Sequence, residues 1–89
     1  MIYDVERAEV SRDPLVAGCS KAPSTHRNFD RAQSAVDDAR AFVRDYQGDA
    51  LPQVRVYRRR RGNSEIILLT FRTPGGEIRE ERCDGKGDA

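Results

Sequence analysis

Histidine and cysteine are scarce in this sequence, and their scarcity limits the chemistry that the chain can support. His26 is the only histidine, and Cys19 and Cys83 are the only cysteines, among 89 residues. Two cysteines that are 64 positions apart do not have the spacing of a zinc site, even with one histidine added. His26 lies close to Ser24 and Cys19 without the spacing of a nucleophile and its base. We therefore expect a protein that is not an enzyme and has no metal or cofactor.

Long apolar segments are also missing. The longest fully apolar run covers only residues 66–69, which is far too short to span a bilayer. The first residues, 1–4, lack the basic and apolar regions of a signal peptide. We expect a cytoplasmic protein with no membrane partner and with reduced thiols; a disulfide between Cys19 and Cys83 is the alternative.

The charges almost balance. Sixteen basic residues face fifteen acidic ones, for a net charge of +1, so the chain as a whole has no strong attraction to nucleic acid or membranes. Any such attraction has to come from local clustering. Only Lys21 and Lys86 are lysines, so the other basic residues are arginines, whose planar guanidinium groups fit carboxylates and phosphates.

One amphipathic helix is predicted at about 30–47. Its apolar residues recur at spacings of three and four. Asp30, with Gln33 three positions later, resembles a capping box, and Asn28 is an alternative cap. Gly48 fits the left-handed position that ends many helices. The apolar stripe consists of Phe29, Ala32, Ala35, Val36, Ala39, Phe42, Val43 and Tyr46.

Strands are predicted on both sides of the helix. The segment 2–10 alternates as a strand does but slips by one position at Ala8, which indicates a bulge or an edge strand. The segment 11–28 predicts a long loop, which could contain a short strand at 15–17 or contact a partner. Three further strands form a meander with turns at 62–63 and 73–76. We place them around 54–60, at 65–72, which is apolar on both faces, and at 77–82.

The expected fold is therefore α+β, with the order β-α-β-β-β and one helix packed on a mostly antiparallel sheet. We expect residues 1–83 to form a single domain and 84–89 a flexible tail. In the last strand only Ile78 is expected to point inward, and its charged neighbours are expected to protect a sheet edge.

A dense arginine cluster is the strongest functional signal. Alternation on a strand predicts that Val54 and Val56 face the helix and that Arg55, Tyr57 and Arg59 form an open row. Such a row could bind an acidic protein, or hold phosphates and stack a base. Alternatively, the arginines are solvated and pair with Glu77, Glu80 and Glu81 on neighbouring strands. The candidate partner-binding residues are Arg55, Tyr57, Arg58, Arg59, Arg60, Arg61 and Arg72.

Asp37 and Asp38 form an acidic counterpart on the helix. Adjacent residues of a helix point about 100° apart, so these two carboxylates do not converge as a catalytic pair would. We interpret them, with Asp45, as a solvated helix face; a surface that meets a basic partner is the alternative.

Two resemblances add to this interpretation. The segment 75–82, Gly-Gly-Glu-Ile-Arg-Glu-Glu-Arg, followed by Asp84-Gly85, resembles the closing hairpin of a family of small bacterial proteins of unknown function. The size, the single helix and the mixed charge resemble small phage and prophage accessory proteins, of which anti-CRISPR proteins are an example. The second resemblance implies an inhibitor that docks on a larger protein or ribonucleoprotein complex. A small nucleic-acid-binding module that uses residues 55–61 is the alternative. Neither resemblance implies an oligomeric state.

Overall fold

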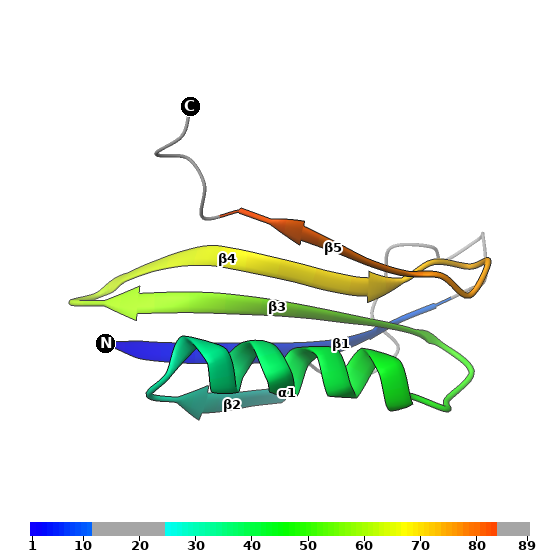
Figure 1. The fold of residues 1–89 in the computed structure, drawn as a ribbon, viewed down its shortest axis with the longest axis horizontal. Helices are drawn as coiled ribbons and strands as arrows, with labels where there is room; N and C mark the ends of the chain where they lie inside the picture. Colours follow the sequence, from blue (N-terminus) through cyan, green and yellow to red (C-terminus); the bar gives the residue numbers. More distant parts are fainter. Residues whose placement is uncertain (12–24, 84–89) are drawn as a thin grey trace.

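A computed structural model describes residues 1–11 and 25–83 as one helix packed on a five-stranded antiparallel sheet (Figure 1). The strand order is β2-β1-β3-β4-β5, so β2 and β5 form the two edges. The predicted α+β architecture is confirmed, with β2 as an additional strand before the helix. The expected tail at 84–89 and the short strand at 15–17 lie outside the described residues. The elements are β1 (Ile2–Val10), β2 (Thr25–Phe29), α1 (Ala32–Asp45), β3 (Leu51–Arg60), β4 (Asn63–Arg72) and β5 (Ile78–Arg82).

Strand β1 is a regular inner strand, so the predicted bulge or edge position was wrong. It pairs with β2 on one side and with β3 on the other, in unbroken register along both. The apparent slip arose because both of its faces carry apolar residues. Val5 is fully buried beneath the helix, and Ala8 is buried on the opposite face of the sheet. The bulge lies in β4, at the shift of register between Val56 and Tyr57 of β3.

Helix α1 is shorter than predicted and begins without a side-chain cap. Arg31 occupies the N-cap position, and its side chain makes no capping hydrogen bond. Asp30 precedes the helix, and Gln33 donates to Asp37 one turn later at 2.8 Å, so the predicted capping box does not form. Tertiary packing stabilises the helix without the capping box, because Ala35, Ala39 and Val43 are fully buried against the sheet.

Gly48 follows the helix for a reason other than the predicted left-handed turn. Tyr46 ends the helix in an extended conformation, and the positive φ angles of described glycines occur at Gly62 and Gly76. At Gly48 the Tyr46 side chain approaches so closely that a Cβ atom would lie 2.3 Å from its hydroxyl. Gly48 therefore leaves room for the Tyr46 ring, which also packs against Phe42 at 5.6 Å between ring centroids.

The core lies between α1 and the central strands. Valines and leucine from β1, β3 and β4 pack on three small helix residues, and Tyr3, Phe29, Val36 and Phe42 close its margins. Val54 and Val56 point at the helix as predicted. The packed core consists of Val5, Ala35, Ala39, Val43, Val54, Val56, Ile67 and Leu68.

Strand β5 extends beyond this core. Its five residues are all exposed, and Ile78 keeps 48% of its surface accessible, so the prediction that Ile78 points inward was wrong. The reason is the position of the helix, whose main contacts are with β1 to β4. An ion pair links the two elements, since Arg40 of α1 donates to Glu80 at 2.7 and 3.0 Å.

Candidate functional site

The β3–β4 hairpin carries the free part of the arginine cluster at its tip. Arg61 and Gly62 turn the chain with φ angles of 47° and 86°, the left-handed pair that a tight two-residue hairpin needs. Arg59, Arg60 and Arg61 are exposed there, and none of them forms an ion pair with a described residue. Three consecutive arginines are therefore exposed at the tip without an ion pair to any carboxylate in the described part of the chain.

Apolar side chains and two grooves border this tip. Ile2 pairs with Arg59 across β1 and β3, and Met1 and Ile2 expose 59% and 48% of their surfaces. A groove of about 560 Å³ lies between these two residues and the hairpin, and a second groove of about 360 Å³ is lined by Arg58, Arg60 and Glu65 together with Asn63 and Ser64. The N-terminus and the β3–β4 hairpin lie at the same end of the sheet (Figure 1). Positive charge and exposed apolar side chains are therefore combined at this end.

Arg58 and Arg72, two of the predicted site residues, bind other parts of the domain on the helix side of the sheet. Arg58 lies on the helix side of β3 and binds the Glu65 carboxylate across the hairpin. Arg72 reaches the last turn of the helix and donates to the carbonyl groups of Val43, Arg44 and Tyr46, the last of these at 3.0 Å. These carbonyl groups have no partner within the helix, so Arg72 acts as its C-terminal cap.

Arg55 and Tyr57 lie on the sheet face away from the helix, in the predicted row with Arg59. Both contact Glu6 of the neighbouring strand: the Tyr57 hydroxyl donates to its carboxylate at 2.9 Å, and Arg55 Nη1 lies 3.7 Å from it. Burial, together with the Glu6 carboxylate, raises the pKa of Tyr57. The row therefore divides into a paired part on the sheet and a free part at the tip. Of the predicted partners, Glu80 and Glu81 belong to β5 and Glu77 directly precedes it, and β4 separates β5 from β3.

His26 joins this polar cluster, which sequence analysis missed. It is part of β2 instead of the expected loop, and its Nδ1 lies 2.9 Å from an oxygen of the buried Asp4 carboxylate. Its Nε2 lies 3.9 Å from Glu6. The alternation of Asp4 and Glu6 along the first strand was a visible signal, but only the pairing of β1 with β2 and β3 brings these residues to His26 and Tyr57.

This cluster has no evident catalytic or metal-binding arrangement. Its members include no serine, cysteine or lysine nucleophile. Within the described ranges, no three histidine, cysteine, aspartate or glutamate side chains gather as a metal site would require. Its hydrogen bonds tie β2 and β3 to β1, which is a structural role. Cys83 is an exposed free thiol, and Cys19 lies outside the described residues.

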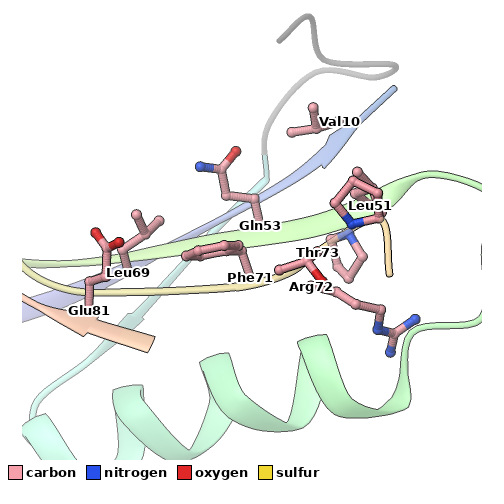
Figure 2. A pocket seen from close by; sticks show the side chains of 10 residues that line it. Val10, Leu51, Gln53, Leu69, Phe71, Arg72, Thr73 and Glu81 are labelled. Atoms are coloured by element: carbon pink, nitrogen blue, oxygen red, sulfur yellow. The ribbon is translucent and has the colours of Figure 1, made fainter. Parts of the chain in front are cut away.

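A small apolar cavity of about 270 Å³ lies at the other end of the sheet (Figure 2). Val10, Gln53 and Leu69 line it from the side away from α1, whereas Arg72 at its margin points toward the end of the helix. Its walls include Leu51, Phe71 and two prolines, so its lining is mainly apolar, with Thr73 and Glu81 among its few polar residues.

Asp38, one of the two neighbouring aspartates on the helix, binds arginines of the sheet. Its carboxylate accepts two hydrogen bonds from Arg7 of β1, at 2.8 and 2.9 Å, and one from Arg27 of β2, at 3.1 Å. Asp37 is exposed and contacts only the helix itself through Gln33. The two neighbouring carboxylates diverge as predicted, but only Asp37 belongs to a solvated face.

Comparisons with known proteins give no relative: no family model, no curated protein and no solved structure matches this chain. No helix in the described part of the chain is long and apolar enough to cross a membrane.

Proposed function

We propose that the protein is a non-enzymatic binding protein that docks the tip of its β3–β4 hairpin on an acidic surface of a larger protein or ribonucleoprotein complex. The observation that carries this proposal is the separation within the arginine cluster. Arg55, Arg58 and Arg72 have partners within the domain, whereas Arg59, Arg60 and Arg61 are exposed at the tip and form no ion pair with a described residue.

The neighbours of the tip favour a protein surface as the partner. Interfaces between proteins combine arginine with exposed apolar side chains, as Arg59 and Ile2 do here. A nucleic acid that followed the sheet from the tip would meet the carboxylates of Asp4 and Glu6, which repel phosphates. Tyr57, the aromatic residue expected to stack a base, is half-buried, with its hydroxyl bonded to Glu6.

The tip is also suited to binding and not to chemistry. Arginine side chains stay charged at all accessible pH values, so they cannot exchange protons as a general base does. A domain of this size with one charged contact surface would act as an inhibitor or adaptor. A phage or mobile-element origin and action in the cytoplasm are parts of the same proposal, and they rest on the size and architecture of the domain.

The proposal is tested by reversing the charge at the tip. The double variant Arg59→Glu with Arg60→Glu should lose its protein partners in a pull-down from host lysate, and the purified partner should bind at least roughly tenfold more weakly through like-charge repulsion. Because both side chains are exposed, the melting temperature should stay unchanged. The matched control is Arg31→Glu with Arg44→Glu, which changes the net charge by the same amount on the helix.

Capture of the same proteins by the tip variant and by wild type would contradict the proposal. Nuclease treatment distinguishes the alternative function. If all captured material disappears with nuclease, and if a synthetic oligonucleotide binds with an affinity that falls steeply as salt increases, the hairpin is a nucleic-acid-binding module.

A further inference from the structure

The larger of the two grooves at the hairpin tip has apolar as well as charged walls. Its volume is about 560 Å³, within the range of roughly 300–1,000 Å³ that is usual for binding pockets. Met1 and Ile2 line it together with Arg59 and Arg60. With Ile78, Met1 and Ile2 are the most exposed large apolar residues in the described part of the chain. The groove can therefore receive an apolar side chain as well as charged groups.

The sheet holds the apolar wall of this groove in place. Ile2 begins β1 and pairs with Arg59 of β3, so the register of two strands fixes its backbone position. The Tyr3 hydroxyl donates to Met1 Sδ at 3.2 Å, which restrains the second apolar side chain. A wall that is already ordered loses little conformational entropy when a partner binds. Ile2 and Met1 are thus suited to form the apolar part of a contact surface.

Arginines flank the groove from both faces of the sheet. Successive residues of a strand point to opposite faces, so Arg59 lies on the face away from the helix and Arg60 on the helix side. The aliphatic part of an arginine can pack on an apolar group while its guanidinium group binds a carboxylate. An apolar side chain in the groove would therefore have a guanidinium group on either side of it.

The carboxylates nearby restrict where an acidic ligand can lie. Glu65 is bound by Arg58, and Asp4 is buried beside His26, and neither of these acids lines the groove. A ligand that continued along the sheet would meet Glu6, which repels negative charge. An acidic ligand is therefore favoured at the end of the sheet, across the groove and the two arginines beside it.

We propose that this groove binds an acidic protein segment that inserts one aliphatic side chain beside Ile2, with a carboxylate on each side of it for Arg59 and Arg60. This inference rests on the proposed function and names the kind of segment that the tip recognises. A buried apolar anchor surrounded by polar contacts is the usual arrangement at the centre of a protein interface. A segment that lacks either the aliphatic side chain or the carboxylates binds more weakly.

Synthetic peptides test this inference on the unchanged protein. The first is acetyl-Gly-Ser-Asp-Glu-Leu-Glu-Asp-Ser-Gly-amide, the second has serine in place of leucine, and the third has asparagine and glutamine in place of the acids. In an NMR titration of the full chain, the leucine peptide should shift the amide signals of Ile2, Arg59 and Arg60, with a Kd on the order of 1 mM or lower. The other two peptides should bind at least roughly fivefold more weakly.

Two isoleucine variants provide a matched comparison. Ile2 and Ile78 each expose 48% of their surface, so Ile2→Ser and Ile78→Ser remove similar apolar groups at different places in the sheet. Ile2→Ser should weaken binding of the leucine peptide by at least roughly fivefold and leave binding of the serine peptide unchanged, because the lost contact is with the leucine. Ile78→Ser should bind both peptides as wild type does.

The outcomes for this inference and for the proposed function are distinguishable. Failure of the leucine peptide to bind, equal binding of the leucine and serine peptides, or equal effects of the two isoleucine variants would each overturn the inference. An oligonucleotide that binds the tip more tightly than the leucine peptide would also overturn it. The proposed function survives the first three results if Arg59→Glu with Arg60→Glu still loses its protein partners, since that variant tests charge alone.

Discussion

At the residue scale, the fold depends on charged side chains that reach from one element to another. Arg72 caps the helix from β4, Arg40 fastens the helix to β5, and Arg58 binds across the β3–β4 hairpin. The neighbouring sequence does not reveal the role of these arginines, because the fold brings each of them to a partner in another element. Arg59, Arg60 and Arg61 at the hairpin tip have no such contact with a described residue, and they are the candidates for binding.

The Arg40–Glu80 pair predicts a pH dependence of stability. The ordinary pKa of a glutamate is 4.5, and the hydrogen bond from Arg40 lowers the pKa of Glu80 below it. A depressed carboxylate pKa contributes stability above the unfolded value, and this contribution disappears as the pH falls through the folded value. We expect Glu80→Gln to lower the melting temperature at about pH 6 and to match wild type near pH 3.

Thermal melts of both proteins across this pH range measure the effect. A difference in melting temperature that stays constant from neutral to acidic pH would show that the ion pair contributes nothing. Glu77→Gln is the control, because the Glu77 carboxylate is exposed and its ion pair, at 3.1 Å, is with the nearby Arg79 instead of the helix.

At the element scale, Asp38 holds α1 against the edge of the sheet that β2 forms. It receives hydrogen bonds from Arg7 and Arg27, two residues of different strands, and its side chain is only 14% exposed. Arg7 also lies over the Phe42 ring at 4.9 Å, and its Nε is buried without a hydrogen-bond partner among the described residues. The helix is thus fixed to β1 and β2 by charge as well as by apolar packing.

Substitution of the two neighbouring aspartates should separate these roles. Asp38→Ala should reduce the free energy of unfolding by about 1.5–3 kcal/mol, the usual contribution of hydrogen bonds to charged groups, because Arg7 would be left half-buried without its carboxylate. Asp37→Ala, one residue away, should change it by no more than about 0.5 kcal/mol. Urea denaturation of both variants checks this, and equal effects would show that Asp38 is as solvated as Asp37.

At the scale of the whole molecule, the domain is stabilised by a small core of valine, alanine and leucine. The largest fully buried side chains include Leu68, Val5, Val43, Val54 and Val56. A domain of this size buries only roughly 60–65% of its unfolded surface, so each of these positions matters. Val36, in the predicted stripe, lies at the margin of the core.

Val43→Asp should abolish the cooperative unfolding transition, because an unpaired charge at a fully buried position costs a large part of the roughly 5–15 kcal/mol that stabilises a typical domain. Val36→Asp should leave a folded protein with a lowered melting temperature, since an aspartate there can reach solvent. Circular dichroism during heating distinguishes the two. A cooperative melt of Val43→Asp would mean that the helix packs on the sheet through another face.

The sequence by itself determined the α+β class, the amphipathic helix and the three-stranded meander. The reason is that periodicities of 3.6 and 2 residues and turn residues such as Gly62 act locally. It also determined which side chains of β3 share a face, since alternation follows from strand geometry.

Only the tertiary structure decided which of those side chains are free. The sheet order placed Glu6 of β1 beside Arg55 and Tyr57, and it placed β5 too far away to neutralise them. The register of β1 with β2 brought His26 to Asp4. Such pairings join residues that are distant in the chain, and many registers are compatible with the same alternation until the whole sheet assembles around its core. For this reason the arginine cluster could be located from the sequence, but its free tip could not.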